Sequence, residues 1–191
     1  MRNKTWKYLV VTSAIFVLSA CGGGTKKQVN EDVSMDSVNG VCNGLKTLQL
    51  DEVKVIWIQD NAKKRLMERT LFADAEDSLI ESLKLQGGIP SSMSAFLVET
   101  GGIRILFDTG MGAPDSRLLS GLASLGITPS DIKHLYLTHF HGDHIGGMMK
   151  GDSVVFPDAE VYASKVEYDA WLKMPADRNA QVVKTMNAYK D

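Results

Sequence analysis

The chain has 191 residues, of which 44% are hydrophobic and 23% charged, and this composition supplies enough apolar material for one folded domain. Its formal charge of −2 gives no electrostatic reason to expect nucleic acid as a partner. Without the three basic residues among the first seven, 18 basic residues face 23 acidic ones and the net charge becomes −5. The balance of charge therefore disfavours a nucleic-acid-binding protein.

The first 20 residues have the pattern of a secretory leader. Arg2, Lys4 and Lys7 are basic, and residues 8–20 are mostly apolar but too short to span a bilayer comfortably. The segment ends in Leu18-Ser19-Ala20-Cys21, which resembles the lipobox of bacterial lipoproteins. The resemblance implies cleavage before Cys21, lipid on its thiol, and a protein anchored in the bacterial cell envelope on the exported side of a membrane. The alternative is a plain signal peptide, or a membrane anchor with a chance cysteine.

The segment after Cys21 is rich in Gly, Lys, Asn, Asp and Ser, which predicts a flexible tether between membrane and domain. Cys42 is the only other cysteine, so a lipidated Cys21 leaves no internal disulfide. We therefore expect three parts: a signal peptide over 1–20, a tether over 21–46 and a folded domain over 47–191.

The folded part is expected to begin with a strand over 53–58, a β-branched apolar run. Two further apolar runs, 95–99 and 103–107, flank Thr100-Gly101-Gly102 and predict a β-hairpin, because glycine accepts the positive φ of such turns. A helix over 115–125 follows from leucines spaced along one face: Leu118, Leu119, Leu122 and Leu125, with Gly126 as its C-cap.

The remaining elements alternate between helix and strand. Thr128-Pro129 predicts a short helical turn, and residues 134–138 form a strand that leads directly into a histidine cluster. Short strands are expected over 154–156 and 160–163, and Ser164 with Glu167 suits a capping box for a helix through Trp171. Alternation without a long structureless gap predicts an α/β layered fold.

The histidine cluster is the strongest chemical signal in the sequence. Three of the four histidines lie in Thr138-His139-Phe140-His141-Gly142-Asp143-His144-Ile145-Gly146-Gly147. Alternate residues of an extended segment point to the same side, so His139 and His141 can converge. Imidazole nitrogen and carboxylate oxygen are ligands for zinc and related divalent metals, so the cluster predicts a metal site.

This run resembles the HxHxDH signature of the metallo-β-lactamase superfamily, whose members include lactonases, thioesterases, nucleases and β-lactamases. The resemblance covers roughly residues 53–172. It implies that His139 and His141 serve one metal, and that Asp143 and His144 serve a second. It further implies that Asp108, in Phe107-Asp108-Thr109-Gly110, forms hydrogen bonds with the histidine-containing segment, residues 138–147, which we call the metal loop. The alternative for Asp108 is a local turn cap, and His134 is expected to be structural or on the surface.

The resemblance also implies a mechanism with zinc or another divalent metal as the cofactor. The metal lowers the pKa of bound water from about 15.7 towards about 7, so hydroxide is available at neutral pH without a side-chain nucleophile. Asp143 is then the catalytic candidate among the ligands, with Asp108 in support. The expected substrate is a small ester, lactone or related molecule.

The resemblance is incomplete along the chain. The family uses further histidine and aspartate ligands after this motif, and no histidine follows His144. The family fold also packs two similar halves face to face. We therefore expect the first half of an αββα sandwich, truncated at its C-terminal side, with doubtful activity on its own. Two other functions stay open: a ribonuclease Z-like phosphodiesterase, which the export leader disfavours, and an inactive metal-binding remnant.

Overall fold

The computed structural model describes residues 44–190. The leader, Cys21 and Cys42 lie outside these residues, and so does most of the predicted tether. Within residues 44–190, no helix is long and apolar enough to cross a membrane.

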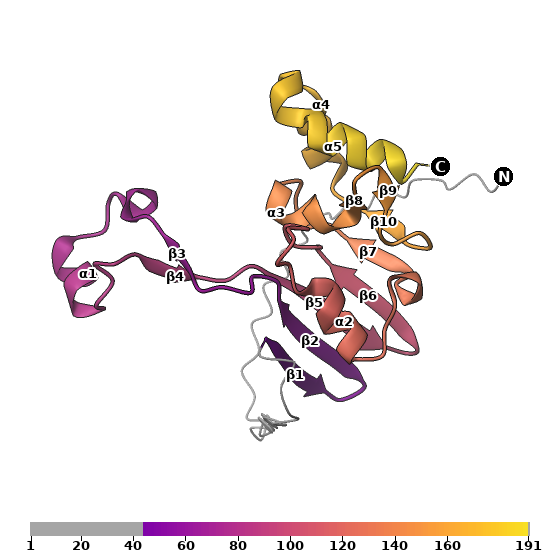
Figure 1. The fold of residues 1–191 in the computed structure, drawn as a ribbon, viewed down its shortest axis with the longest axis horizontal. Helices are drawn as coiled ribbons and strands as arrows, with labels where there is room; N and C mark the ends of the chain where they lie inside the picture. The colour runs from indigo at the N-terminus through magenta and orange to yellow at the C-terminus, as the bar shows by residue number, and fades with distance from the viewer. Residues whose placement is uncertain (1–43, 191) are drawn as a thin grey trace, which may run out of the picture.

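The centre of the fold is a six-stranded sheet with the order β1-β2-β5-β6-β7-β10 (Figure 1). The first four of these strands pair antiparallel, whereas β6, β7 and β10 run parallel to one another. Parallel neighbours end at the same edge of a sheet, so residues that follow them meet there. The strands are β1 (Leu45–Leu50), β2 (Val53–Gln59), β5 (Ser94–Thr100), β6 (Ile103–Phe107), β7 (His134–Tyr136) and β10 (Glu160–Tyr162).

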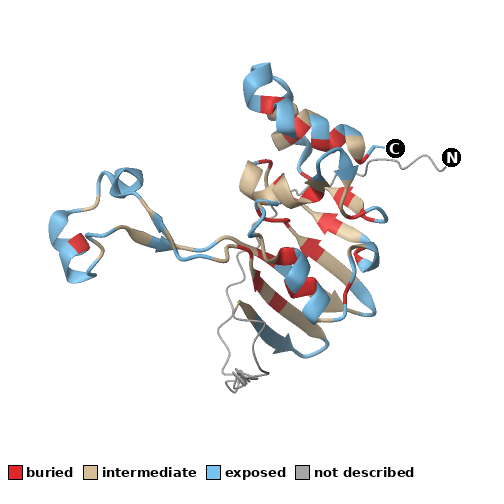
Figure 2. Ribbon diagram, in the orientation of Figure 1, coloured by how far each residue is buried: buried red, intermediate tan, exposed pale blue. Residues whose placement is uncertain are grey.

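One face of this sheet is the buried core. Its side chains alternate along the strands, as the period of two requires, and include Ile56, Leu97, Leu106 and Leu135. Helix α2 (Leu118–Ser124) lies over this face and buries Leu118 and Leu122 against it. Figure 2 shows the resulting buried positions in alternation along the strands.

The opposite face carries one row of aromatic side chains across five neighbouring strands. We call this row the aromatic face; it consists of Trp57, Phe96, Phe107, Tyr136 and Tyr162. Each of these residues is the cross-strand partner of the next one in the row. Tyr136 and Tyr162 stack with ring centroids 4.5 Å apart. All five side chains stay partly or largely exposed, and Phe96 is 43% exposed. The sheet therefore has one covered face and one that is open among the described residues.

The segment after β7 forms short elements and then two longer helices. These are α3 (Gly142–Ile145), the 3-10 turn η3 (Gly146–Met148), β8 (Met149–Lys150), β9 (Ser153–Val154), α4 (Lys165–Leu172) and α5 (Ala176–Ala188). Helix α5 was not predicted, although Val182, Met186 and Tyr189 have helical spacing and are all buried. It packs beside α3 and closes the core at this end.

Most elements expected from the sequence are present. The strand over 53–58, the hairpin, the helical turn η2 (Pro129–Asp131) and the strand after it are confirmed, and Gly126 has the positive φ of a C-cap (71°). The expected α/β layered class is also confirmed. Several bounds were wrong. The strand expected over 134–138 ends at Tyr136, and the strand expected over 154–156 is β9, which covers Ser153–Val154. Helix α2 begins at Leu118 and leaves Leu119 exposed, and β1 begins at Leu45, inside the segment expected to be tether.

The largest unexpected feature is a projecting segment between β2 and β5. We call residues 61–93 the arm; it contains β3 (Arg65–Met67), the 3-10 turn η1 (Arg69–Phe72), α1 (Asp77–Ser82) and β4 (Ile89–Ser91). Strands β3 and β4 pair as a ribbon, which ends in the two short helical turns. The arm extends away from the sheet, and most of its residues are exposed (Figures 1 and 2).

Candidate metal centre

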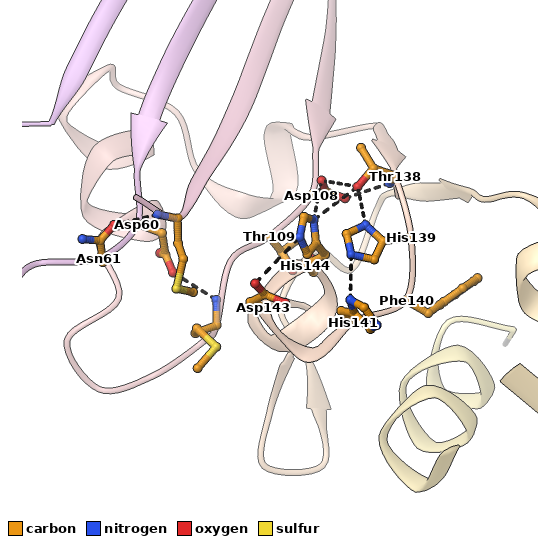
Figure 3. A network of polar contacts seen from close by, with 12 residues as sticks. Asp60, Asn61, Asp108, Thr109, Thr138, His139, Phe140, His141, Asp143 and His144 are labelled. Atoms are coloured by element: carbon orange, nitrogen blue, oxygen red, sulfur yellow. Dashed lines mark hydrogen bonds and ion pairs between the residues drawn. The ribbon is translucent and has the colours of Figure 1, made fainter. Parts of the chain in front are cut away.

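The predicted metal ligands lie at the edge of the sheet where β6 and β7 both end (Figure 3). Asp108 directly follows β6, and Thr138 to His144 follow β7 and lead into α3. His139, His141, Asp143 and His144 are therefore brought together with Asp108, as the sequence predicted. Strand β2 ends at the same edge, and the arm leaves the sheet there.

Asp108 is buried, 5% exposed, and has a positive φ of 59°, a conformation that aspartate adopts more readily than most residues. Its carboxylate accepts hydrogen bonds from the backbone N–H of Thr138 (2.8 Å), the Thr138 hydroxyl (2.7 Å) and His144 Nδ1 (2.8 Å). A carboxylate only accepts, so the His144 proton lies on Nδ1 and the Nε2 lone pair is left for another partner. This is the contact with the metal loop that the resemblance implied.

The same reasoning shows which ring nitrogen of His139 carries the proton. The Thr138 hydroxyl gives its single proton to Asp108, so at 3.0 Å it accepts from His139 Nδ1. The Nε2 lone pair of His139 then faces His141 Nδ1, also at 3.0 Å. Without metal, His141 donates a proton across this gap. Metal binding to the two nitrogens would displace that proton, as metal binding to histidine generally does.

Both ligand pairs pass a simple distance test for metal binding. Zinc lies about 2.0–2.2 Å from imidazole nitrogen and carboxylate oxygen, so two ligand atoms of one ion are at most about 4.3 Å apart. His139 Nε2 and His141 Nδ1 are 3.0 Å apart, and His144 Nε2 and Asp143 Oδ2 are 3.9 Å apart. The donor types and these distances fit two zinc ions, one bound by His139 and His141 and the other by Asp143 and His144.

Residues 44–190 supply no third ligand for either ion. Within residues 44–190, no group of three His, Cys, Asp or Glu side chains is arranged to hold a metal ion. A zinc ion in a protein usually has three or four protein ligands. The assignment of the four residues as ligands therefore stays a prediction, and it needs additional donors to make a closed site.

The pKa of His139 is lowered from its ordinary value. Burial is the main cause, and the neighbouring His144 and His141 add to it. The neutral imidazole is favoured as a result, which is the form that coordinates a metal.

The metal loop is held against the loop after β6 by contacts between backbones. Thr109 donates to the carbonyl of His144 through both its backbone N–H and its hydroxyl, each at 2.8 Å. The N–H of Gly147 donates to the carbonyl of Gly110 at 3.2 Å. A Cβ on Gly146 would overlap the carbonyl of Met111, so the two loops approach too closely for a side chain. Glycine is required at this crossing for space.

A second buried carboxylate, which the sequence analysis missed, fixes the loop after β6. Asp60 follows β2 and is 1% exposed. It accepts from the Ser116 hydroxyl and from the backbone N–H groups of Met111 (3.0 Å), Arg117 (3.1 Å) and Leu118 (3.1 Å). These bonds set the start of α2, so the helix begins later than expected. The available signal was an aspartate directly after an apolar strand, the same context that drew attention to Asp108.

Two other side chains anticipated from the sequence have clear positions. Ser164 caps α4 by accepting from the N–H of Glu167 at 3.3 Å, but the Glu167 carboxylate accepts from Trp171 Nε1 (3.0 Å) and the N–H of Phe140 (3.3 Å). These two bonds of Glu167 thus tie α4 to the metal loop. His134 lies at the opposite edge of the sheet, beside a surface recess of about 360 Å³.

Residues 88–168 match the sequence profile of the metallo-β-lactamase superfamily, and this range contains Asp108 and the whole histidine cluster. This segment is part of a metallo-β-lactamase superfamily domain. The sheet, its helices and the position of the cluster agree with that fold, of which the chain covers a part.

Known proteins share this similarity over limited lengths. The lactamase-like protein nscB of Aspergillus fumigatus is 44% identical over 73 residues, which are 35% of this chain and 21% of that protein. The hydrolase AbOPH of the β-lactamase superfamily is 28% identical, with a TM-score of 0.63 over 77% of this chain and 55% of that one. AidC, a dizinc quorum-quenching lactonase solved with a product, is 26% identical, with a TM-score of 0.63 over 77% and 58%. The chain thus spans about a fifth of its curated relatives and just over half of these solved structures.

Proposed function

We propose that this chain provides the first ligand set of a metal-dependent hydrolase that cleaves a small ester, a lactone or a related molecule. The observation that carries the proposal is the pair of ligand-atom contacts at one sheet edge, with His144 oriented by Asp108. The similarity to a dizinc lactonase supports zinc as the metal and a small molecule as the substrate.

The residues of this chain have separable tasks in such a reaction. His139 and His141 would hold one metal, and Asp143 and His144 a second. A divalent metal held there would lower the pKa of a coordinated water towards about 7 and would polarise a scissile carbonyl oxygen. Asp108 and Thr138 keep the protons of His144 and His139 on Nδ1, so their Nε2 lone pairs remain available.

The test is to measure zinc by elemental analysis together with turnover of a generic lactone. The double substitution His139→Ala, His141→Ala should abolish zinc binding at the site that these two residues form, because no neighbouring group replaces their imidazoles. Asp108→Ala should weaken binding less, by about 10–100-fold, as loss of an orienting contact does. His134→Ala is the matched control, since this histidine lies at the opposite edge. Unchanged zinc content in the double variant would refute the ligand assignment.

A second candidate is metal binding without turnover. It is favoured by one observation: among residues 44–190, neither ligand pair has a third donor. With two ligands each, the ions would bind weakly and their geometry would be underdetermined. Zinc bound with micromolar or weaker affinity and no turnover would support this candidate. Two tightly held ions with clear lactone turnover would support the hydrolase.

We also propose that the protein is anchored to a bacterial membrane by lipid on Cys21. The support is the sequence Leu18-Ser19-Ala20-Cys21 after a basic and apolar leader. Cys21→Ser should release the protein from the membrane fraction or leave the leader attached, whereas Cys42→Ser should change neither. An unmodified thiol on Cys21 of the mature protein, found by mass spectrometry, would contradict the proposal.

A further inference from the structure

The arm exposes more apolar side chain than its own packing requires. Five large apolar residues on it are about half exposed or more: Leu66 (46%), Phe72 (47%), Leu79 (51%), Leu83 (56%) and Leu71 (62%). They lie on the ribbon, on η1 and on or next to α1, so they recur along the outer part of the arm. Apolar groups gathered on a projecting element usually mark a contact surface.

The arm nevertheless has a defined shape of its own. Ile80 is its one buried apolar residue, 6% exposed, and its carbonyl accepts from the N–H of Leu85 at 2.9 Å. The N–H of Met93 donates to the Asn61 side chain at 2.8 Å and closes the base of the ribbon. The exposed residues are therefore held on an ordered scaffold and have too few neighbours within it to be buried.

Charge is segregated along the arm. The base carries Lys63, Lys64 and Arg65 with no acidic residue among them. The outer part, residues 68–84, carries five acidic residues and two basic ones. The base is thus positive by three charges, the outer part is negative by three, and the whole arm is neutral. Within residues 44–190, none of Lys63, Lys64 and Arg65 is in an ion pair.

We propose that the arm pairs with the arm of a second copy of this chain, side by side and in opposite directions, to form a two-fold dimer. In that arrangement each negative outer part meets the positive base of the other arm. A two-fold contact requires a self-complementary surface, and opposite charge at the two ends of a neutral arm supplies it. The exposed leucines and Phe72 then bury one another in the centre.

The size of the arm suits this role. A stable interface takes about 20–30 residues from each partner, and the arm has 33 residues, most of them exposed. The net negative outer part is unfavourable for insertion into an anionic lipid surface, which attracts basic segments. A second copy is therefore the occupant that both the apolar and the charged residues fit.

Paired charge reversals test the proposal on the full chain. Two copies with different tags are co-expressed, and one is captured while the other is measured. The base-reversed variant is Lys63→Glu, Lys64→Glu, and the outer variant is Asp74→Lys, Glu81→Lys; all four side chains are exposed. We expect each variant to lose self-capture by about tenfold, because like charges then face each other. Mixing the two variants should restore capture to the wild-type level, since both contacts become opposite in charge.

Each remaining outcome overturns the proposal. A wild-type chain that captures no second copy is a monomer. Capture that persists in both variants alone shows association through another surface, such as the aromatic face. Loss in each variant without recovery in the mixture shows that the arm contacts something else, such as lipid or residues 1–43. Leu71→Ser, Leu83→Ser should also reduce capture, and Val166→Ser on α4, 80% exposed, is the matched control. Circular dichroism checks that each variant is folded.

Discussion

The metal loop (residues 138–147) and the arm (residues 61–93) leave the same edge of the sheet but are held in opposite ways. The metal loop is fixed by the body: Asp108, Thr109 and Gly110 all bond to it, and no space remains at the crossing of the two loops. The arm contacts the body at its base, where the N–H of Asp60 donates to the carbonyl of Met93, and projects into solvent beyond it.

This difference shows how two loops of one fold can serve separate purposes. Ligand residues must be held within a fraction of an ångström, so their loop is tied to rigid strands on several sides. A contact surface for another chain must stay open, so its shape comes from internal pairing. Substitutions in the two regions should therefore differ strongly in their cost, and the predictions below run from the largest expected effect to the smallest.

Asp60→Ala should cost the most, about 4 kcal/mol of unfolding free energy. It leaves three backbone N–H groups and the Ser116 hydroxyl without their acceptor in a buried position. Urea denaturation measures the loss, and Asp60→Asn, which keeps one accepting oxygen, should lose less. A cost below about 1 kcal/mol for Asp60→Ala would show that the carboxylate does not hold the loop after β6.

Gly146→Ala should cost about 3 kcal/mol, because its Cβ would overlap the carbonyl of Met111 and the backbone must shift. The matched change in the arm is Gly87→Ala, where nothing lies within 4 Å of the new Cβ. That variant should stay within about 0.5 kcal/mol of the wild type. Equal costs for the two substitutions would contradict the contrast between loop and arm.

Tyr189→Phe should cost about 1–2 kcal/mol. The buried Tyr189 hydroxyl donates to the carbonyl of Met148 (2.8 Å) and accepts from the N–H of Phe156 (3.2 Å), just beyond the metal loop. Burial raises the pKa of Tyr189 from 10.0 to about 12. A raised pKa stabilises the fold below the unfolded value, so this contribution is complete below pH 10 and is lost as pH rises towards 12.

Stability measured across this alkaline range in wild type and in Tyr189→Phe isolates the effect. The difference between the two proteins should shrink as pH rises from 10 to 12. The pKa of Tyr162 is also raised to about 12 by burial and by its bond to Glu160, so some alkaline loss should remain in the variant. A difference that is constant with pH would argue against a buried, protonated Tyr189.

The smallest effect is expected in the arm. Asp77 pairs with Arg69, and their side chains are 79% and 47% exposed. Exposed ion pairs contribute little because water screens them and ordering two long side chains costs entropy. Asp77→Asn should therefore change the unfolding free energy by less than about 1 kcal/mol. A loss comparable to that of Gly146→Ala would mean that the arm is coupled tightly to the body.

The sequence predicted best what is encoded over short distances. The histidine cluster and its strand follow from local patterns, the role of Asp108 was implied by the family resemblance, and the hairpin around Gly101-Gly102 follows from turn chemistry. Asp60 has the same local context, an aspartate directly after an apolar strand, but no family resemblance pointed to it, and its partners lie 51 to 58 residues away. Helix α5 was not predicted, although the spacing of Val182, Met186 and Tyr189 indicates a helix.

The arm could not be predicted for a different physical reason. Its strands and helices are short, with three to six residues each, and Ile80 is the only apolar residue that it buries. Hydrophobic periodicity reports which residues are buried, so a segment with almost nothing buried has no pattern to detect. Its exposed leucines look in the sequence like those of any core-facing element.

The glycine crossing between the two loops has a consequence for how this protein can change over evolution. Where two backbones touch without side chains, neither can gain a residue or a methyl group unless the other moves aside. Single mutations at Gly146 or Gly147 should then be almost always deleterious, and inserted residues in either loop should be rare in natural variants. New binding properties must arise elsewhere, in segments whose length is free to vary. The arm is such a segment, because lengthening a loop whose ends stay fixed costs only about 0.6 kcal/mol per doubling.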